Sequence, residues 1–153
     1  MSEKFKALMI TNENGDYKSK FELIGLEDLP DHPVLIDVAY STVNYKDGLA
    51  LTGKGGKVVR NFPMVGGVDL SGTVIESKSD KFSEGDRVLV NGWGLSETQW
   101  GGFSQKQRIN PDYLTKVPES FSLEEVMAIG TAGYTAMLCI LALEDMCITP
   151  EKG

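Results

Sequence analysis

Hydrophobic and polar residues alternate along most of the first three quarters of the chain, with the two-residue period of half-buried β-strands. The clearest case is residues 34–43, where Val34, Ile36 and Val38 fall on one face and Asp37 falls on the other. Similar patterns predict further short strands over residues 5–11, 17–26, 68–76, 87–90 and 103–109.

Turn residues separate these strands at regular intervals. Asn14 and Gly15 give a tight-turn signal, because both residue types tolerate positive φ. Gly72, inside a strand, indicates a bulge or the close approach of another backbone. The pattern predicts a fold that is mainly β with short helices, arranged as a small barrel or sandwich.

The periodicity changes to helical near the C-terminus. Ser122 and Glu125 match a capping box, which predicts a helix start. The glycine-containing residues 130–133 interrupt this helix, and residues 132–143 resume as a largely apolar one. An all-round apolar helix needs burial on several sides. Two interpretations stay open: its packing partner lies outside these residues, or it packs across the barrel or a dimer interface.

Composition narrows the function classes. The 153 residues suit one domain with a sizeable core, and the net charge of −7 argues against binding to nucleic-acid phosphates as the main task. We find neither a run of about 18 apolar residues nor a signal peptide, so we expect a cytoplasmic protein without a membrane span.

Cysteine and histidine offer little chemistry. Cys139 and Cys147 lie in or near the apolar segment, so we expect buried or semi-buried free thiols, and no CxxC pair is present to hold structural zinc. His32 precedes a proline, which predicts a solvent-facing turn rather than a catalytic base.

Candidate chemistry lies in residues 44–53, a polar segment after a predicted strand. Asn44 can donate and accept hydrogen bonds, and Tyr45 combines a flat ring with a hydroxyl, which suits stacking on a nicotinamide. Packing in the core is the alternative role for Tyr45. For Trp93 and Trp100 the alternatives are walls of an apolar pocket or core residues. Nearby Lys54, Lys57 and Arg60 are either a solvated loop or a local basic pocket.

Several motifs occur in one order along almost the whole chain. They are Asn44-Tyr45-Lys46-Asp47, Arg60-Asn61-Phe62-Pro63, the glycine pattern of residues 66–72, Gly85-Asp86-Arg87-Val88, Trp93-Gly94, Trp100-Gly101-Gly102 and Gly130-Thr131-Ala132-Gly133. Together they resemble the medium-chain dehydrogenase/reductase superfamily, and within it the acryloyl-CoA reductase group, which also includes proteins named as quinone oxidoreductases. The resemblance implies a GroES-like β-barrel catalytic domain over residues 1–121. It also implies linker helices over residues 122–153 that lead toward a Rossmann domain, which is absent from these residues.

Departures from the superfamily pattern imply a metal-free site. Zinc-dependent members carry a cysteine near Asn44 and a His-Glu pair after the first glycine of the Gly66 motif, where this sequence reads Gly66-Gly67-Val68-Asp69. Quinone reductases of the zeta-crystallin type carry Tyr and Arg where Leu49 and Leu51 stand. The resemblance therefore favours the acryloyl-CoA branch.

The implied activity is conjugate reduction of an enoyl thioester such as acryloyl-CoA by NADPH. Tyr45 would contact the cofactor and, with Asn44, act as a catalytic residue. Backbone N–H groups near Gly66 and Gly67 are further candidates for stabilising the thioester oxygen. Thr131, at a helix start, would approach the nicotinamide carboxamide; the alternative role for Thr131 is that of a helix N-cap.

Lys57 or Arg60 would meet the substrate phosphates. Because no GxGxxG motif is present, we expect residues 1–153 alone to bind NADPH weakly. The expected partner is a small molecule, an enoyl-CoA or a quinone, and a homodimer is one possible assembly. Two alternative functions are quinone oxidoreduction and a non-enzymatic GroES-like interaction module.

Overall fold

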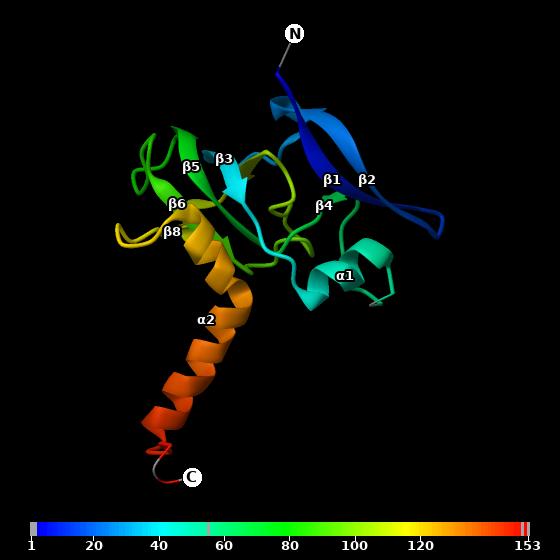
Figure 1. Cartoon of the computed structure of the whole chain (residues 1–153). Helices are drawn as coiled ribbons and strands as arrows, with labels where there is room; N and C mark the ends of the chain where they lie inside the picture. The colour runs from blue at the N-terminus through cyan, green and yellow to red at the C-terminus, as the bar shows by residue number, and fades with distance from the viewer. Residues whose placement is uncertain (1–2, 55, 151, 153) are drawn as a thin grey trace.

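Two antiparallel sheets form the body of the molecule (Figure 1). The computed structural model describes residues 3–54, 56–150 and 152. One sheet has the order β2-β1-β4 and the other has the order β7-β3-β5-β6-β8. The strands are β1 Lys4–Glu13, β2 Asp16–Gly25, β3 Val34–Tyr40, β4 Met64–Val65, β5 Asp69–Ser77, β6 Arg87–Asn91, β7 Lys106–Ile109 and β8 Thr115–Lys116. The helices are α1 Tyr45–Thr52 and α2 Leu123–Asp145, with 3-10 turns at Leu26–Asp28 and Pro111–Tyr113.

The predicted turn and the predicted close approach are both confirmed. Asn14 and Gly15 have φ values of 53° and 92° and join β1 to β2 as a tight hairpin. A Cβ added to Gly72 would lie 2.2 Å from the backbone oxygen of Asp37, so only glycine fits where β5 passes β3. The β3–β5 register also shifts at this point, as a bulge requires.

Core side chains come from both faces of β3. Val34 and Ile36 are fully buried in one cluster, as the alternation predicts, while Leu35 is buried in another cluster on the opposite face. The segment before β7 connects the two sheets: Leu8 N–H donates to the oxygen of Phe103 over 2.8 Å, and Val38 N–H donates to that of Gln105 over 2.9 Å. The predicted strand over 103–109 is therefore regular only in β7, and the two sheets join into one body that remains open.

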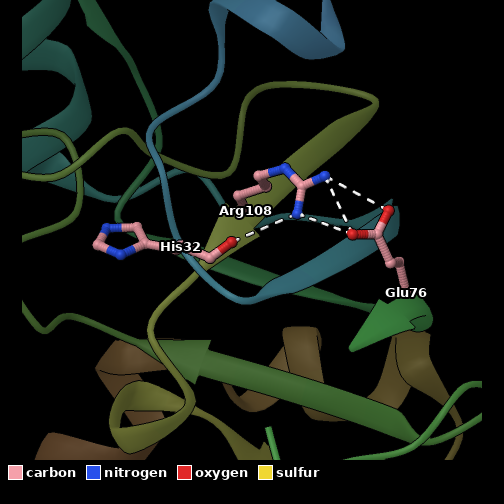
Figure 2. Close-up of polar contacts among 3 residues, drawn as sticks. All are labelled: His32, Glu76 and Arg108. Carbon is pink, nitrogen blue, oxygen red and sulfur yellow. Dashed lines mark hydrogen bonds and ion pairs between the residues drawn. The ribbon is translucent and has the colours of Figure 1, made fainter. Parts of the chain in front are cut away.

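Arg108 ties three segments together at one end of the larger sheet (Figure 2). Its guanidinium Nη2 lies 3.3 Å from Glu76 Oε1, and its Nη1 donates to the backbone oxygen of His32 over 3.4 Å. The His32 ring points away from this pair, and its Nε2 lies 3.3 Å from Gln99 Oε1. His32 lies in the irregular segment between the 3-10 turn at Leu26–Asp28 and β3, and it is half-buried rather than solvent-facing as predicted.

Helix α1 was not predicted as a helix from the sequence. Its start is set by Asn44, whose backbone N–H donates to the Asp47 carboxylate over 2.7 Å, and its end by Gly53, which has φ 67°. Ala50 is fully buried in a cluster with Ile10, and this contact orients α1 against the smaller sheet.

Helix α2 has two parts that differ in their surroundings. Its start matches the predicted capping box: Ser122 Oγ accepts from Glu125 N over 3.1 Å, and Glu125 Oε2 accepts from Ser122 N over 2.8 Å. Val126 and Met127 then pack against the barrel. At Gly130 the backbone leaves helical geometry, with φ 52° and ψ −166°, and beyond it the helix extends away from the sheets (Figure 1).

The sequence expectation for the two cysteines near the C-terminus is wrong. Cys139 and Cys147 are exposed, because no described residue packs over the distal turns of the helix. Helix α2 contains an 18-residue window with a mean hydropathy of 1.9. By length and composition alone, the helix is long and apolar enough to cross a membrane. The sequence prediction overlooked this window because its glycines and threonines interrupt the apolar run. Many core helices of soluble proteins meet the same criterion.

Candidate functional site

The centre of the candidate site is the carboxylate of Asp69, which is fully buried at the start of β5. Its Oδ2 accepts hydrogen bonds from Thr42 Oγ1 over 2.6 Å, Asn44 Nδ2 over 3.1 Å and the backbone N–H of Thr131 over 3.0 Å. Its Oδ1 accepts from Asn91 Nδ2 over 3.2 Å and from the Thr131 hydroxyl. One carboxylate thus joins the segment after β3, the end of β6 and helix α2.

These donors determine the ionisation of Asp69. Burial raises the pKa of this carboxyl, but hydrogen bonds from Thr131, Thr42 and Asn91 outweigh burial and hold the pKa below its ordinary value. Asp69 is therefore a buried anion whose charge is compensated by neutral donors rather than by a cation.

A second buried carboxylate, Asp47, fixes the start of α1. It accepts from the backbone N–H of Asn44 over 2.7 Å and from that of Val68 over 3.0 Å. Burial raises the pKa of Asp47; these hydrogen bonds oppose the shift, and the nearby charge of Asp69 adds to it. Asp47 thereby ties α1 to the residue that directly precedes Asp69.

Asn44 lies between the two carboxylates. Its side-chain nitrogen donates to Thr42 Oγ1 over 2.8 Å and to Asp69 Oδ2 over 3.1 Å, which uses both amide hydrogens. The structure thus gives the Asn44 amide group a structural task beside the predicted catalytic one.

Tyr45 is the first residue of α1 and is 86% exposed, so packing in the core is not its role. The neighbouring Val43 is 85% exposed, and together they present an apolar surface beside the buried cluster. An exposed ring held at the rigid start of a helix is suited to stack on a ligand.

Thr131 lies on the other side of Asp69, at the start of the second part of α2. Gly130 makes this possible, because its φ of 52° interrupts the helix and a Cβ there would lie 3.0 Å from Thr42 Cγ2 and 3.2 Å from Asp69 Oδ2. The Asp69 carboxylate therefore takes the position of an N-cap for the helical turns that follow Gly130.

A pocket of about 470 Å³ adjoins this cluster. Its connection to Asp69 is Asn91, which lines the pocket and also donates to the carboxylate. Aromatic rings dominate the lining: Trp93 stacks on Tyr113 with ring centroids 5.1 Å apart, and Tyr134 comes from α2. The full lining consists of Leu89, Asn91, Trp93, Tyr113, Thr115 and Tyr134.

The two tryptophans have different roles. Trp93 is 60% exposed and lines the pocket, in agreement with the interpretation as a pocket wall. Trp100 packs against two core clusters, and its indole N–H donates to the backbone oxygen of Pro63 over 3.1 Å. Trp100 is half-buried: it packs against the core and also lines a separate pocket with Met9 and Pro63, so both interpretations apply to it.

The prediction for the glycine pair needs correction. The N–H of Gly66 donates to the backbone oxygen of Leu8 over 3.0 Å, so it serves the sheet and is not available to a substrate oxygen. Gly67 is buried directly against Phe103. Because glycine has no Cβ, the backbone of Phe103 can lie close to the glycine pair, and this contact connects the two sheets.

The sequence analysis missed both carboxylates of the site. The signal for Asp69 was a charged residue at the start of an otherwise apolar strand. The signal for Asp47 was its position three residues after Asn44, as in a capping box. Among the described residues, no group of three or more His, Cys, Asp or Glu side chains is placed to hold a metal ion.

Comparisons with known proteins identify relatives of this chain. The profile of the alcohol dehydrogenase GroES-like domain matches residues 30–119. The acrylyl-CoA reductase AcuI of Ruegeria pomeroyi is 44% identical over 151 residues, which cover 97% of this chain and 46% of that protein. YhfP of Bacillus subtilis, which is named for quinone oxidoreductase activity, is 44% identical over 154 residues, covering 100% of this chain and 46% of that protein.

A solved structure has the same backbone over nearly the whole chain. The YhdH oxidoreductase of Salmonella enterica, crystallised in complex with NADP, is 43% identical with a TM-score of 0.92. The match covers 97% of this chain and 45% of that one. The chain therefore spans about half the length of these relatives.

Proposed function

This chain belongs to the alcohol dehydrogenase GroES-like domain family of the medium-chain dehydrogenases and reductases, and we propose that it forms the catalytic domain of an NADPH-dependent reductase of activated alkenes. The proposed substrate is an enoyl thioester such as acryloyl-CoA. Identities of 44% to AcuI and 43% to an NADP-bound oxidoreductase support this choice.

The observation that carries the proposal is the Asp69 cluster. It joins the exposed ring of Tyr45, through Asn44, to Thr131 and to the aromatic pocket beside Asn91. A flat apolar ring, a polar helix start and an adjacent apolar pocket are the parts that a nicotinamide and its substrate need at one place.

Each residue has a defined task in this proposal. When bound, a dihydronicotinamide would supply the hydride for the β-carbon of the alkene, and a proton from solvent would complete the reduction at the α-carbon. The Tyr45 ring orients the nicotinamide. The Thr131 hydroxyl gives its hydrogen to Asp69, so its oxygen lone pairs are free to accept from the carboxamide NH2 group.

The developing charge on the thioester oxygen needs a donor. The Gly66 N–H and both Asn44 amide hydrogens already donate to other groups of the protein. We therefore assign the Tyr45 hydroxyl as the donor to the thioester oxygen. Asn44 contributes by starting the helix that carries Tyr45 and by connecting that helix to Asp69. We propose that Asn44 acts in the reaction site as a residue that positions Tyr45.

We also propose the wider organisation of the protein. The profile match ends at residue 119, which supports a domain boundary between residues 121 and 122. The exposed apolar face of α2 then packs against the nucleotide-binding part of the protein. We further propose a cytoplasmic enzyme that acts on small molecules without a membrane partner, with a homodimer as one candidate assembly. The net charge of −7 supports only the absence of a nucleic-acid partner.

The test is an activity assay on the protein as its gene encodes it. Loss of NADPH absorbance is followed with acryloyl-CoA and, separately, with a naphthoquinone. Faster turnover of acryloyl-CoA supports the proposal; faster turnover of the quinone favours quinone reduction, the second candidate, which the identity to YhfP supports. Turnover of neither favours a non-enzymatic interaction module.

A variant series tests the site itself. Tyr45→Phe removes only the hydroxyl, and we expect kcat to fall about tenfold or more, as for the loss of an oxyanion donor. Tyr45→Ala removes the ring as well, and we expect KM for NADPH to rise in addition. Phe21→Ala, at a ring that is 72% exposed on β2, is the matched control and should leave both constants unchanged.

A further inference from the structure

The loop between α1 and β4 carries three exposed cations, Lys54, Lys57 and Arg60. Cations elsewhere in this acidic chain commonly pair with a carboxylate, as Lys81 pairs with Asp112. No described carboxylate lies within salt-bridge distance of the three loop cations, and a pocket of about 370 Å³ is lined by Lys57, Val59 and Arg60. The loop is therefore a local positive site on a protein with net charge −7.

The structure holds this pocket in a defined place. Val59 is buried in the cluster that contains Ala50 of α1, so the middle of the loop is anchored to the core. Arg60 N–H donates to the backbone oxygen of Glu97 over 2.8 Å, and the Glu97 carboxylate pairs with Lys46 of α1. Arg60 is thus fixed near the first turn of α1, which begins with Tyr45.

We propose that Lys57 and Arg60 bind the phosphate groups of the coenzyme A portion of the substrate, with Lys54 adding to the local positive charge. The inference rests on the proposed function. It assigns a binding site to the phosphate end of the substrate, which the reaction site near Tyr45 does not hold. The pantetheine arm separates the thioester from the phosphates, so a phosphate site is expected at a distance from Tyr45, and Glu97 connects the Arg60 backbone to Lys46 in the first turn of α1. A guanidinium and an ammonium without carboxylate partners are suited to phosphate oxygens.

This assignment makes the loop a specificity determinant. A quinone carries no phosphate and gains nothing from Lys57 and Arg60, whereas a coenzyme A thioester gains charge-assisted hydrogen bonds. NADPH also carries phosphates and is the other source of the same chemistry, so the test must separate the two.

The experiment compares two thioesters on the protein as its gene encodes it: acryloyl-CoA, and acryloyl-N-acetylcysteamine, which has the same reacting group without phosphates. For the double variant Lys57→Ala/Arg60→Ala we expect KM for acryloyl-CoA to rise about ten- to a hundredfold. KM for the short thioester and KM for NADPH should stay within about twofold of wild type. Lys78→Ala, at an exposed lysine at the far end of β5, is the matched control.

Salt and direct binding complete the test. Raising the salt concentration should raise KM for acryloyl-CoA in the wild type and much less in the double variant. Calorimetric titration with coenzyme A alone should give weaker binding to the double variant than to the wild type. An unchanged KM and unchanged coenzyme A affinity in the double variant would overturn the inference, as would an increase in KM for NADPH alone. If the wild type turns over neither thioester, the proposed function fails, and the titration still decides whether the phosphate site exists.

Discussion

Thr131 donates both its backbone N–H and its hydroxyl to the carboxylate of Asp69, a residue 62 positions earlier in the chain. The pair connects the start of β5 to the point where α2 leaves helical geometry at Gly130. Because the same carboxylate also holds Asn44, the positions of α1 and α2 depend on one buried charge. Substitutions at Asp69 should therefore affect stability and site geometry together.

The first prediction concerns Asp69→Asn. The amide keeps one acceptor oxygen but replaces the other with an NH2 group, which cannot accept from the donors that now meet Oδ2. We expect the free energy of unfolding to fall by about 2–4 kcal/mol, the cost of leaving buried donors unpaired and removing bonds to a charged group. Urea denaturation followed by tryptophan fluorescence measures this change.

Two variants provide the scale for that measurement. Asp31→Asn makes the same chemical change at an exposed position and should shift the free energy of unfolding by less than about 0.5 kcal/mol. Thr131→Val removes only the hydroxyl donor and should cost about 1–2 kcal/mol. If Asp69→Asn proved as mild as Asp31→Asn, the cluster would not have the structural role described above.

The second prediction concerns pH. The pKa of Asp69 is lower in the folded state than its ordinary value of 3.8, so the unfolded state takes up the proton first as the pH falls. The stability that this charge contributes is present above pH 3.8 and is lost as the pH falls through the folded-state pKa. The stability difference between wild type and Asp69→Asn should therefore stay constant in the neutral range and shrink only as the pH falls below about 3.8.

Asp47 should show the opposite sign. Its pKa is raised in the folded state, so the stability linked to its protonation is present at low pH and is lost as the pH rises through the raised pKa. The free energy of unfolding of Asp47→Asn, relative to that of wild type, should thus be highest near pH 7 and should fall as the pH is lowered. Urea denaturation series at several pH values test both variants, and parallel curves for wild type and both variants would contradict the assigned shifts.

The third prediction concerns Gly130. Its φ of 52° with ψ of −166° is a conformation that residues with a Cβ rarely adopt, and the nearest atoms leave a new methyl little room. Gly130→Ala should destabilise the fold by about 1–3 kcal/mol and disturb Thr131. Gly48→Ala, inside α1 with open space around it, is the matched control and should be neutral or stabilising by up to about 1 kcal/mol. Equal effects of the two substitutions in urea denaturation would argue against the break at Gly130.

Local patterns explain why most of the fold could be predicted from the sequence. The turn at Asn14 and Gly15, the close approach at Gly72 and the capping box at Ser122 each depend on residues near one another in the chain. Helix α1 escaped prediction because its eight residues follow a strong strand and its start depends on the Asp47 carboxylate.

The candidate site was only partly predictable. Tyr45, Asn44 and Thr131 were identified, and the structure brings Asn44 and Thr131 onto one carboxylate. The carboxylate itself was missed because its importance comes from donors on three separate segments, and no sequence spacing records that convergence. The role expected of the Gly66 N–H failed for the same reason, since its partner Leu8 lies on a distant strand.

The last prediction concerns the exposed apolar face of α2. Cys139 and Cys147 are exposed in residues 1–153, so in that chain both thiols should react rapidly with a thiol reagent such as Ellman's reagent. If α2 is covered in the protein as its gene encodes it, as we propose, Cys139 in the middle of the apolar segment should react at least about tenfold more slowly there, because access would require local opening. Adding denaturant should restore equal rates in both samples, which controls for oxidised thiols. Equally rapid reaction of both native samples would show that the helix stays uncovered, and the proposed packing of α2 against a nucleotide-binding part would have to be abandoned.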